Sequence, residues 1–188
     1  MEEWKTYKIG DLCDSMSETY KRGSERVVLI NTSDVYNGKC ENHKYVMNRD
    51  LKGQFKKTFQ KHDILYSEIR PTNKRFAYID FDATDYIAST KLMVVRSNDK
   101  VLSRFLYHHL KSQPMLDELQ ALAESRSGTF PQITFSELAN LEIPVPTIET
   151  QQRIVDFIDS IENKIELNNR INHNLARVAS VIQTNIPA

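Results

Sequence analysis

In the C-terminal part of the chain, from Ile154 onward, a mostly apolar set of positions recurs at alternating spacings of four and three residues. These positions are 154, 158, 161, 165, 168, 172, 175, 179 and 182. A sustained period of about 3.5 residues keeps one stripe of a helix aligned with a partner helix that supercoils around it. No Gly or Pro lies between Pro146 and Pro187. The pattern predicts one uninterrupted helix of about 33 residues and ~50 Å, with Thr147 or Thr150 as its cap.

This stripe constrains the whole molecule, because a lone helix would expose a long apolar face to water. Phe157, Ile171 and Val178 widen that face. We therefore expect a partner helix, from a second copy or from another chain. The residues expected to pair with it are Ile154, Ile158, Ile161, Ile165, Asn168, Asn172, Leu175 and Ile182.

Two asparagines, Asn168 and Asn172, occupy consecutive positions of the stripe near its middle. A buried Asn lowers stability but selects register and oligomeric state, because its amide must find a polar partner. The alternative is that the paired helices separate there and both amides contact water. The sequence leaves both interpretations open.

Residues 1–146 have the pattern of a mixed α+β domain, and we place its boundary with the helical segment, 147–188, after Pro146. The expected fold is a globular domain with a twisted β-sheet and small helices, followed by one long coiled-coil helix. Runs rich in β-branched and aromatic residues predict strands at 27–31, 64–69, 76–81, 91–96 and 141–146. Turn-rich segments lie at 20–26, 36–39 and 70–75.

Short helices are expected between the last two of these strands. The apolar spacing of residues 105–110 predicts a helix that Pro114 ends or kinks, and residues 115–124 predict a second helix. The sequence SRSGTFPQ, 125–132, is expected to form a loop, because its Gly and Pro favour non-helical backbone. Residues 134–137, TFSE, have the spacing of a capping box that begins one further helical turn.

Positive charge is concentrated in one block, although the whole chain is formally neutral. Residues 20–75 contain 13 Lys and Arg against 6 Asp and Glu, a net charge of +7. A local field of this kind attracts nucleic acid even when the total charge is zero. The block is either such a surface or an ordinary solvated, lysine-rich one.

Catalytic motifs are absent from the sequence: it has no GxGxxG, Walker A, HExxH or GxSxG pattern. Asp63, Glu68 and Arg70 partly match a metal-dependent nuclease, but their spacing is too short and DILYSEIR has the pattern of a core strand. Cys13 and Cys40 lack metal-ligand spacing and are expected to be free thiols. No window approaches a membrane span, so we expect a cytoplasmic binding module without cofactor or metal.

The order of several segments resembles the specificity subunit of Type I restriction–modification systems. WKTYKIGDLCD and VVLINTSDVYNGK resemble the opening of its target-recognition domain, and KHDILYSEIRPTNKRFAYID with IASTKLMVVR resembles its central β region. The most specific part is FLYHHLKSQPMLDELQALAESRSGTFPQITFSELANLEIPVPTIETQQRIVDFID. The chain departs from the family in having one recognition domain and one long helix, where the family usually has two of each. It is expected to be either a natural half-subunit that dimerises or a fragment that ends inside or just after the first long helix.

The resemblance implies a division of labour between the two parts of the chain. The domain would read one half of a bipartite sequence in double-stranded DNA. The helix would pair antiparallel with a second one and dock methyltransferase subunits, through which the restriction subunit would join. Methyl transfer and cleavage would then belong to partners, and this chain would not be an enzyme.

Three loops carry side chains suited to DNA, where Lys and Arg bind phosphates and Arg, Asn and Gln read base edges. RPTNKR is the first candidate for base reading, SRSGTFPQ is the second, and YKRGSER is expected to contact phosphates. The stretch Lys52–Lys61 is a weaker phosphate candidate. The candidate DNA-binding residues are Lys21, Arg22, Arg26, Arg70, Asn73, Lys74, Arg75, Arg126, Ser127 and Thr129.

A second class of function also fits the pattern. The coiled coil alone would be the functional surface of a protein-interaction scaffold whose globular domain does not touch DNA. The two hypotheses differ in one observable: DNA binding that weakens with salt is expected for the first and not for the second. The bases that are read cannot be derived from the sequence, because recognition loops vary on a common scaffold.

Overall fold

A computed structural model describes residues 4–21, 23–50, 53–126 and 129–184, with side chains given for all of these except 50 and 178–184. The chain divides into two compact units, Met1–Gln151 and Gln152–Ala188. The sequence pattern places the boundary slightly earlier, after Pro146; the first turn of the long helix belongs to the first unit. Each unit is described by itself below.

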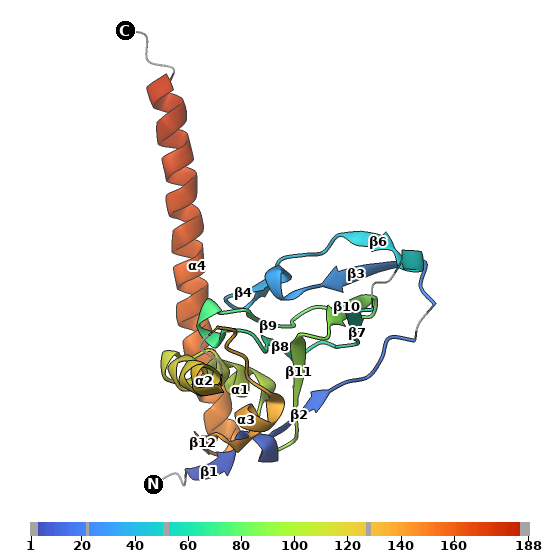
Figure 1. Ribbon diagram of the computed structural model, residues 1–188. Coiled ribbons are helices and arrows are strands. Elements are labelled where there is room, and N and C mark those ends of the chain that lie inside the picture. Colours follow the sequence, from blue (N-terminus) through green and yellow to red (C-terminus); the bar gives the residue numbers. More distant parts are fainter. Residues whose placement is uncertain (1–3, 22, 51–52, 127–128, 185–188) are drawn as a thin grey trace. The chain divides into compact units, whose positions relative to one another are not determined.

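The first four-stranded sheet of unit 1 is antiparallel and has the order β2 (Cys13–Met16), β11 (Leu92–Ser97), β8 (Ile64–Ser67), β9 (Phe76–Tyr78) (Figure 1). Its two central strands are the apolar runs ILYS and LMVV, and these residues are buried. Three of its strands lie within segments that the sequence predicts as β structure.

The second four-stranded sheet has the order β6 (Tyr45–Met47), β3 (Arg26–Ile30), β10 (Tyr86–Ser89), β7 (Phe55–Lys57). Strands β3 and β10 are parallel, with Val28 opposite Tyr86, and the other pairs are antiparallel. The expected mixed α+β fold is confirmed, and the longer strands divide between two four-stranded sheets. A long crossover joins β3 to β10, and local sequence patterns do not reveal such pairings.

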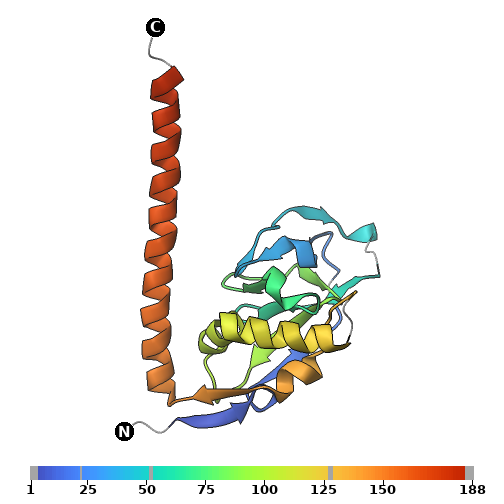
Figure 2. The ribbon, with the colours of Figure 1, turned by 60° about the vertical axis from the view of Figure 1, so that its left-hand side comes forward.

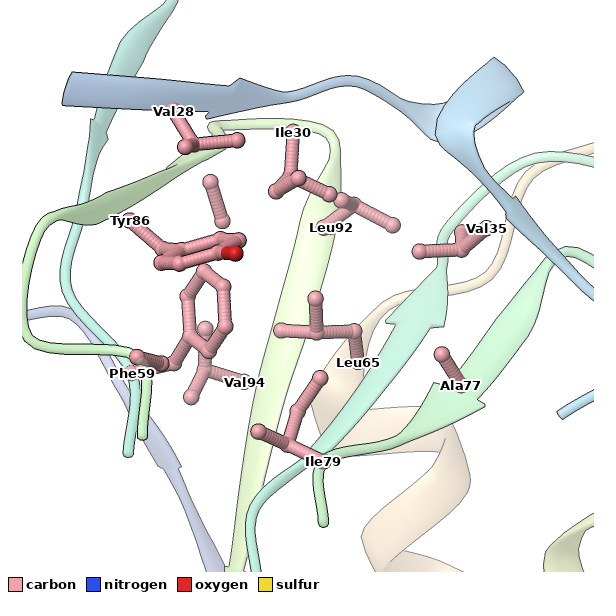
Figure 3. Close-up of a cluster of buried hydrophobic side chains, with 12 residues drawn as sticks. Val28, Ile30, Val35, Phe59, Leu65, Ala77, Ile79, Tyr86, Leu92 and Val94 are labelled. Atoms are coloured by element: carbon pink, nitrogen blue, oxygen red, sulfur yellow. The ribbon is translucent and has the colours of Figure 1, made fainter. Parts of the chain in front are cut away.

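The core of unit 1 lies between these two sheets (Figure 3). Val28 and Ile30 of β3 and Tyr86 of β10 face Leu65 of β8 and Val94 of β11 in one buried cluster. Fully burying each aliphatic side chain of this kind contributes about 1.5–3 kcal/mol. The alternating β-branched residues thus explain why the sheets pack face to face.

Two small sheets complete the β structure. Strands β1 (Lys5–Lys8) and β12 (Glu142–Val145) are antiparallel and bring the ends of unit 1 together (Figure 2). Strands β4 (Val35–Tyr36) and β5 (Lys39–Cys40) form a tight hairpin. Among the described residues, Cys13 and Cys40 are free thiols, as expected.

Three α-helices follow β11 in unit 1. Helices α1 (Ser103–Leu110) and α2 (Gln113–Arg126) agree with the prediction, except that α1 ends before Pro114. Pro114 instead lies in the first turn of α2, where its missing N–H costs nothing. Helix α3 (Phe135–Asn140) begins with the predicted capping box between Thr134 and Glu137.

In the described part of the chain, short 3-10 turns connect these elements: η1 (Ile9–Asp11), η2 (Thr32–Asp34), η3 (Asn48–Asp50) and η4 (Pro71–Asn73).

Helix α4 (Ile148–Thr184) has 37 residues and no break (Figure 2), which corresponds to about 55 Å. Thr147 caps it: its Oγ1 accepts a hydrogen bond from the Thr150 N–H at 3.4 Å. Of the two predicted caps, Thr147 is correct, and Thr150 lies inside the first turn. No helix in the described part of the chain is both long and apolar enough to cross a membrane.

The first turn of α4 is fastened to unit 1 by Gln151, which is fully buried. Its Oε1 accepts a hydrogen bond from the Leu102 N–H at 2.8 Å. Its Nε2 donates to the carbonyl oxygens of Lys100 at 3.2 Å and Pro146 at 3.0 Å. All three backbone groups would lose this partner if an apolar residue stood here.

Candidate nucleic-acid interface

The loop after β8 has a backbone that few sequences adopt. Arg70 and Lys74 have left-handed φ angles of 43° and 54°, on either side of η4. Pro71 is buried and supplies the φ that the turn requires. Backbone hydrogen bonds from Asn73 to Arg70, 2.9 Å, and from Lys74 to Pro71, 3.0 Å, close the turn. RPTNKR is thus a stiff loop, as the sequence predicts.

A second segment, residues 129–133, lies directly against this loop. The Arg70 N–H donates to the Pro131 carbonyl at 3.2 Å, and Arg70 Nη2 donates to the Thr129 carbonyl at 3.3 Å. The Ile133 N–H donates to the Glu68 carbonyl at 2.8 Å. The structure therefore joins two of the three predicted segments, and we call residues 68–75 and 129–133 the joined-loop surface.

Helix α2 supports the joined-loop surface from one side. Gln120 Oε1 accepts hydrogen bonds from the Thr72 hydroxyl at 3.1 Å and from the Thr72 N–H at 3.4 Å. Gln120 is not recognisable from the sequence, because one amide on an amphipathic helix carries no motif. Its role follows from the tertiary contact alone.

The predicted base-reading residues differ in how their side chains are used. Asn73 is exposed, and its amide makes no hydrogen bond to any other described residue. Lys74 is half-buried, and Thr129 is exposed beside the exposed ring of Phe130. Asn73 and Thr129 therefore have exposed side chains that a base edge can reach, whereas Lys74 is less accessible.

Arg75 is engaged within the protein. Its Nη1 donates to the carbonyl oxygens of Ser33 at 3.1 Å and Val35 at 3.5 Å, and its guanidinium lies 5.3 Å from the ring centroid of Tyr36. The residue is half-buried. The charge of Arg75 remains at the surface, but its Nη1 group is engaged in hydrogen bonds that hold the β4–β5 hairpin.

Arg126 lies on α2 and not in a loop, which corrects the prediction for the start of SRSGTFPQ. Its Nη1 donates to both carboxylate oxygens of Glu137, at 3.1 and 3.0 Å. Partial burial raises the pKa of Glu137, but hydrogen bonds from Thr134 and the charge of Arg126 outweigh it, so that the pKa is lowered. Ser127 lies outside the described residues.

The basic segment YKRGSER lies at the other end of β3 (Figure 1). Arg26 begins this strand, and Ser33, the partner of Arg75, follows its end. An extended chain rises about 3.3 Å per residue, so the five residues of β3 separate the basic segment from the Arg75 contact by roughly 17 Å. Lys21 and Arg26 are exposed, Arg26 lies 5.8 Å from the ring of Tyr45, and Arg22 lies outside the described residues.

The lysine-rich stretch Lys52–Lys61 is partly used by the fold. Lys57 Nζ donates to the Leu92 carbonyl at 2.8 Å, and burial lowers its pKa. Lys56 and Lys61 are exposed. Lys57 is therefore unsuited to phosphate contact, whereas Lys56 and Lys61 remain accessible.

The acids considered for a nuclease have structural partners. Asp63 is buried, and its carboxylate accepts two hydrogen bonds from Arg96, both 2.8 Å, and one from the Gln60 N–H at 2.8 Å. Glu68 lies 3.7 Å from Lys91. The Asp63 carboxylate is thus engaged through both oxygens, and Glu68 pairs with a lysine.

The stripe on α4 becomes more exposed along the helix. Ile154 and Ile158 are half-buried, whereas Ile161, Ile165 and Leu175 are 42%, 54% and 61% exposed. Asn168 and Asn172 are exposed, and the side chain of Ile182 lies outside the described residues. The predicted pairing face is therefore accessible over the middle of the helix.

Comparison with known proteins gives a consistent picture. The family model for the Type I restriction modification DNA specificity domain matches residues 1–177. The Type I restriction enzyme HindI specificity subunit of Haemophilus influenzae is 44% identical over 184 residues, which is 97% of this chain and 40% of that protein. The MjaIX specificity subunit of Methanocaldococcus jannaschii is 33% identical over 81 residues, 43% of this chain and 18% of that protein.

Solved structures with the same fold include a chain from a type I R-M system studied for its assembly and conformational transition, with a TM-score of 0.78 at 23% identity. The HsdS subunit from Thermoanaerobacter tengcongensis has a TM-score of 0.76 at 23% identity. Each match covers 95% of this chain and 47% of the solved one. The chain thus spans less than half the length of these relatives.

Proposed function

Because this chain belongs to the family of Type I restriction modification DNA specificity domains, we propose that unit 1 recognises one half of a bipartite DNA sequence for a restriction–modification complex. The observation that carries the proposal is the family match over residues 1–177, with 44% identity to a specificity subunit. The proposal concerns recognition, and methyl transfer and cleavage are assigned to partner subunits.

The joined-loop surface is the proposed base-reading region. It presents Arg70, Asn73 and Lys74 from one loop and Thr129 from the other, on a backbone held by several hydrogen bonds. Such preorganisation favours specific readout, because little entropy is lost when the side chains engage bases. Asn matches an adenine edge, and Arg or Lys matches a guanine edge.

The proposed phosphate contacts lie at the other end of β3, at Lys21 and Arg26. Both are exposed and suited to the salt-dependent, sequence-independent part of binding. Two contact regions roughly 17 Å apart would fix the orientation of unit 1 on a duplex. Phosphate contacts position a protein, whereas base contacts specify the sequence.

Helix α4 is proposed to pair antiparallel with a second long helix and to dock methyltransferase subunits. The accessible face at Ile161, Ile165 and Leu175 supports this role, because apolar surface of this extent favours association. A helix of about 55 Å would hold two recognition domains apart, as a bipartite target requires.

Mapping the methylated sites in cells that carry the system tests the proposal. We expect one bipartite sequence whose methylation disappears when this chain is deleted. A duplex with that sequence should bind the purified chain more tightly than a scrambled duplex, with affinity that falls as salt rises. Equal binding to both duplexes, or no salt dependence, would favour the protein-interaction scaffold instead.

Two substitutions examine the joined-loop surface within this test. Asn73→Ala is expected to relax the preference at one base pair, and Arg75→Ala is expected to weaken binding to all sequences. Unchanged affinity and specificity in both variants would remove this loop from the interface.

A further inference from the structure

The β4–β5 hairpin lies against the joined-loop surface, although the sequence marks it only as a turn. The Asn37 N–H donates to the Lys74 carbonyl at 2.8 Å, and the Gly38 N–H donates to the Phe76 carbonyl at 2.9 Å. The Tyr78 N–H in turn donates to the Gly38 carbonyl at 3.2 Å. The hairpin tip is therefore a third segment at the same place.

The tip is held rigidly. Asn37 and Gly38 have left-handed φ angles of 44° and 97°, the conformation of a two-residue hairpin turn. A Cβ atom on Gly38 would collide with the Tyr107 hydroxyl of α1. Val35, just before the tip, is fully buried in the core. The tip can therefore present its side chains in one fixed geometry.

Tyr36 is an exposed aromatic residue on this rigid tip. Its side chain is 47% exposed, and the Arg75 guanidinium lies 5.3 Å from its ring centroid. Arg75 also binds the carbonyl oxygens that precede the ring, at Ser33 and Val35. Aromatic side chains held by a cation at the surface are suited to contact with bases and sugars.

The amide of Asn37 is not needed by the fold. The residue is exposed, and its side chain makes no hydrogen bond to any described residue. The turn requires a positive φ, which Gly supplies equally well. The side-chain amide is thus a free pair of donor and acceptor groups. It belongs to a residue whose backbone binds Lys74, the neighbour of the similarly exposed Asn73.

We propose that the hairpin tip is a base-reading element, in which the Asn37 amide contacts an adenine edge and Tyr36 packs on the adjoining nucleotide. Arg75 is a positioning residue that holds Tyr36. The inference rests on the proposed function and adds specificity-determining residues from a different segment of the chain. An Asn amide forms two hydrogen bonds with adenine in the major groove and cannot do so with the other bases.

The test selects preferred duplexes from a random DNA pool with the complete chain. The variants are Asn37→Gly, which keeps the turn, Tyr36→Ala, Arg75→Lys and Arg75→Ala. Trp4→Ala is the matched control, since Trp4 is 48% exposed and precedes β1, away from the hairpin. Thermal unfolding shows whether each variant is folded.

Asn37→Gly is expected to lose the preference at one A·T pair by roughly tenfold or more, while the remaining preferences stay unchanged and the unfolding temperature does not fall, because Gly adopts the positive φ of the turn without strain. Arg75→Lys keeps the charge but lacks the planar fork. It should therefore resemble Tyr36→Ala, and combining it with Tyr36→Ala should add little further loss.

The inference is overturned if Asn37→Gly selects the same sequences with the same affinity as the unsubstituted chain. Recovery of full affinity by Arg75→Lys would show a simple phosphate contact and contradict the positioning role. If the unsubstituted chain selects no sequence while binding its partner subunits, the proposed function fails and the inference fails with it. The first two outcomes leave the proposed function intact.

Discussion

Left-handed backbone at residues other than glycine is concentrated in the proposed interface. Four described residues have this conformation, and Asn37, Arg70 and Lys74 are three of them. Each costs of order 1–3 kcal/mol and persists where surrounding contacts enforce it. The hydrogen bond from Asn37 to Lys74 joins two of these residues. This part of unit 1 thus sacrifices stability to hold a particular surface shape.

Gly38→Ala is predicted to destabilise unit 1 by about 2–4 kcal/mol, from its positive φ and the clash with Tyr107. Urea unfolding measures the change. Gly53→Ala is the control, because no atom lies within 4 Å of its added Cβ. It is expected to change stability by less than about 0.5 kcal/mol. Equal effects of the two substitutions would contradict the rigid-tip description.

At the level of elements, helices α3 and α4 are each held at their first turn by a side chain, one charged and one neutral. Helix α3 begins with a solvent-accessible capping box that includes Glu137, which also binds Arg126. The first turn of helix α4 is held by the buried amide of Gln151. The first arrangement depends on charge and hence on pH, whereas the second depends on burial.

Gln151→Met is predicted to lower the free energy of unfolding by about 2–4 kcal/mol, because the backbone groups of Leu102, Lys100 and Pro146 lose the partner that the buried Gln151 amide provides. Chemical denaturation provides the measurement. The neighbouring Gln152→Met removes an exposed hydrogen bond to Asp156 and should cost less than about 0.5 kcal/mol. A cost for Gln152→Met as large as for Gln151→Met would refute the assignment.

Glu137→Gln is predicted to destabilise the chain at neutral pH but to have less effect in acid. The folded-state pKa of Glu137 is lowered, so its contribution is present above the ordinary value of 4.5 and is lost as pH falls through the folded pKa. Measuring the free energy of unfolding of both proteins from about pH 7 to about pH 3 tests this. If the difference in stability between the two proteins grows as the pH falls, the prediction is contradicted.

At the scale of the whole molecule, the two units divide recognition from assembly in the proposed function. Unit 1 carries the joined-loop surface and the hairpin, and α4 carries an apolar face that its own unit does not cover at Ile161, Ile165 and Leu175. The chain spans 40–47% of the length of the relatives with the broadest matches.

Ile165→Glu is predicted to weaken the complex that α4 forms by more than about tenfold, because it places a charge in an apolar seam. Sedimentation velocity measures self-association, and the same measurement with methyltransferase subunits measures docking. Asn163→Glu is the control on a polar position of the same helix. If both variants associate as tightly as the unsubstituted chain, the seam is not the pairing face.

Periodicity and local spacing were enough to predict much of the fold. The 3.5-residue repeat predicted α4, the apolar runs predicted β3, β8, β9, β11 and β12, and the capping box predicted the start of α3. The stiff turn in RPTNKR was also predictable, from its proline. These features depend on residues a few positions apart, so that the sequence by itself determines them.

Tertiary structure decided how these pieces meet. The parallel pairing of β3 with β10, the contact of Arg70 with residues 129–131 and the contact of Asn37 with Lys74 join distant segments, which no local pattern encodes. Tertiary contacts also engaged two predicted DNA-binding residues within the protein, Arg75 with carbonyl oxygens and Arg126 with Glu137. Sequence thus determined which side chains are suitable, and the fold determined which remain available, because availability depends on neighbours that are remote along the chain.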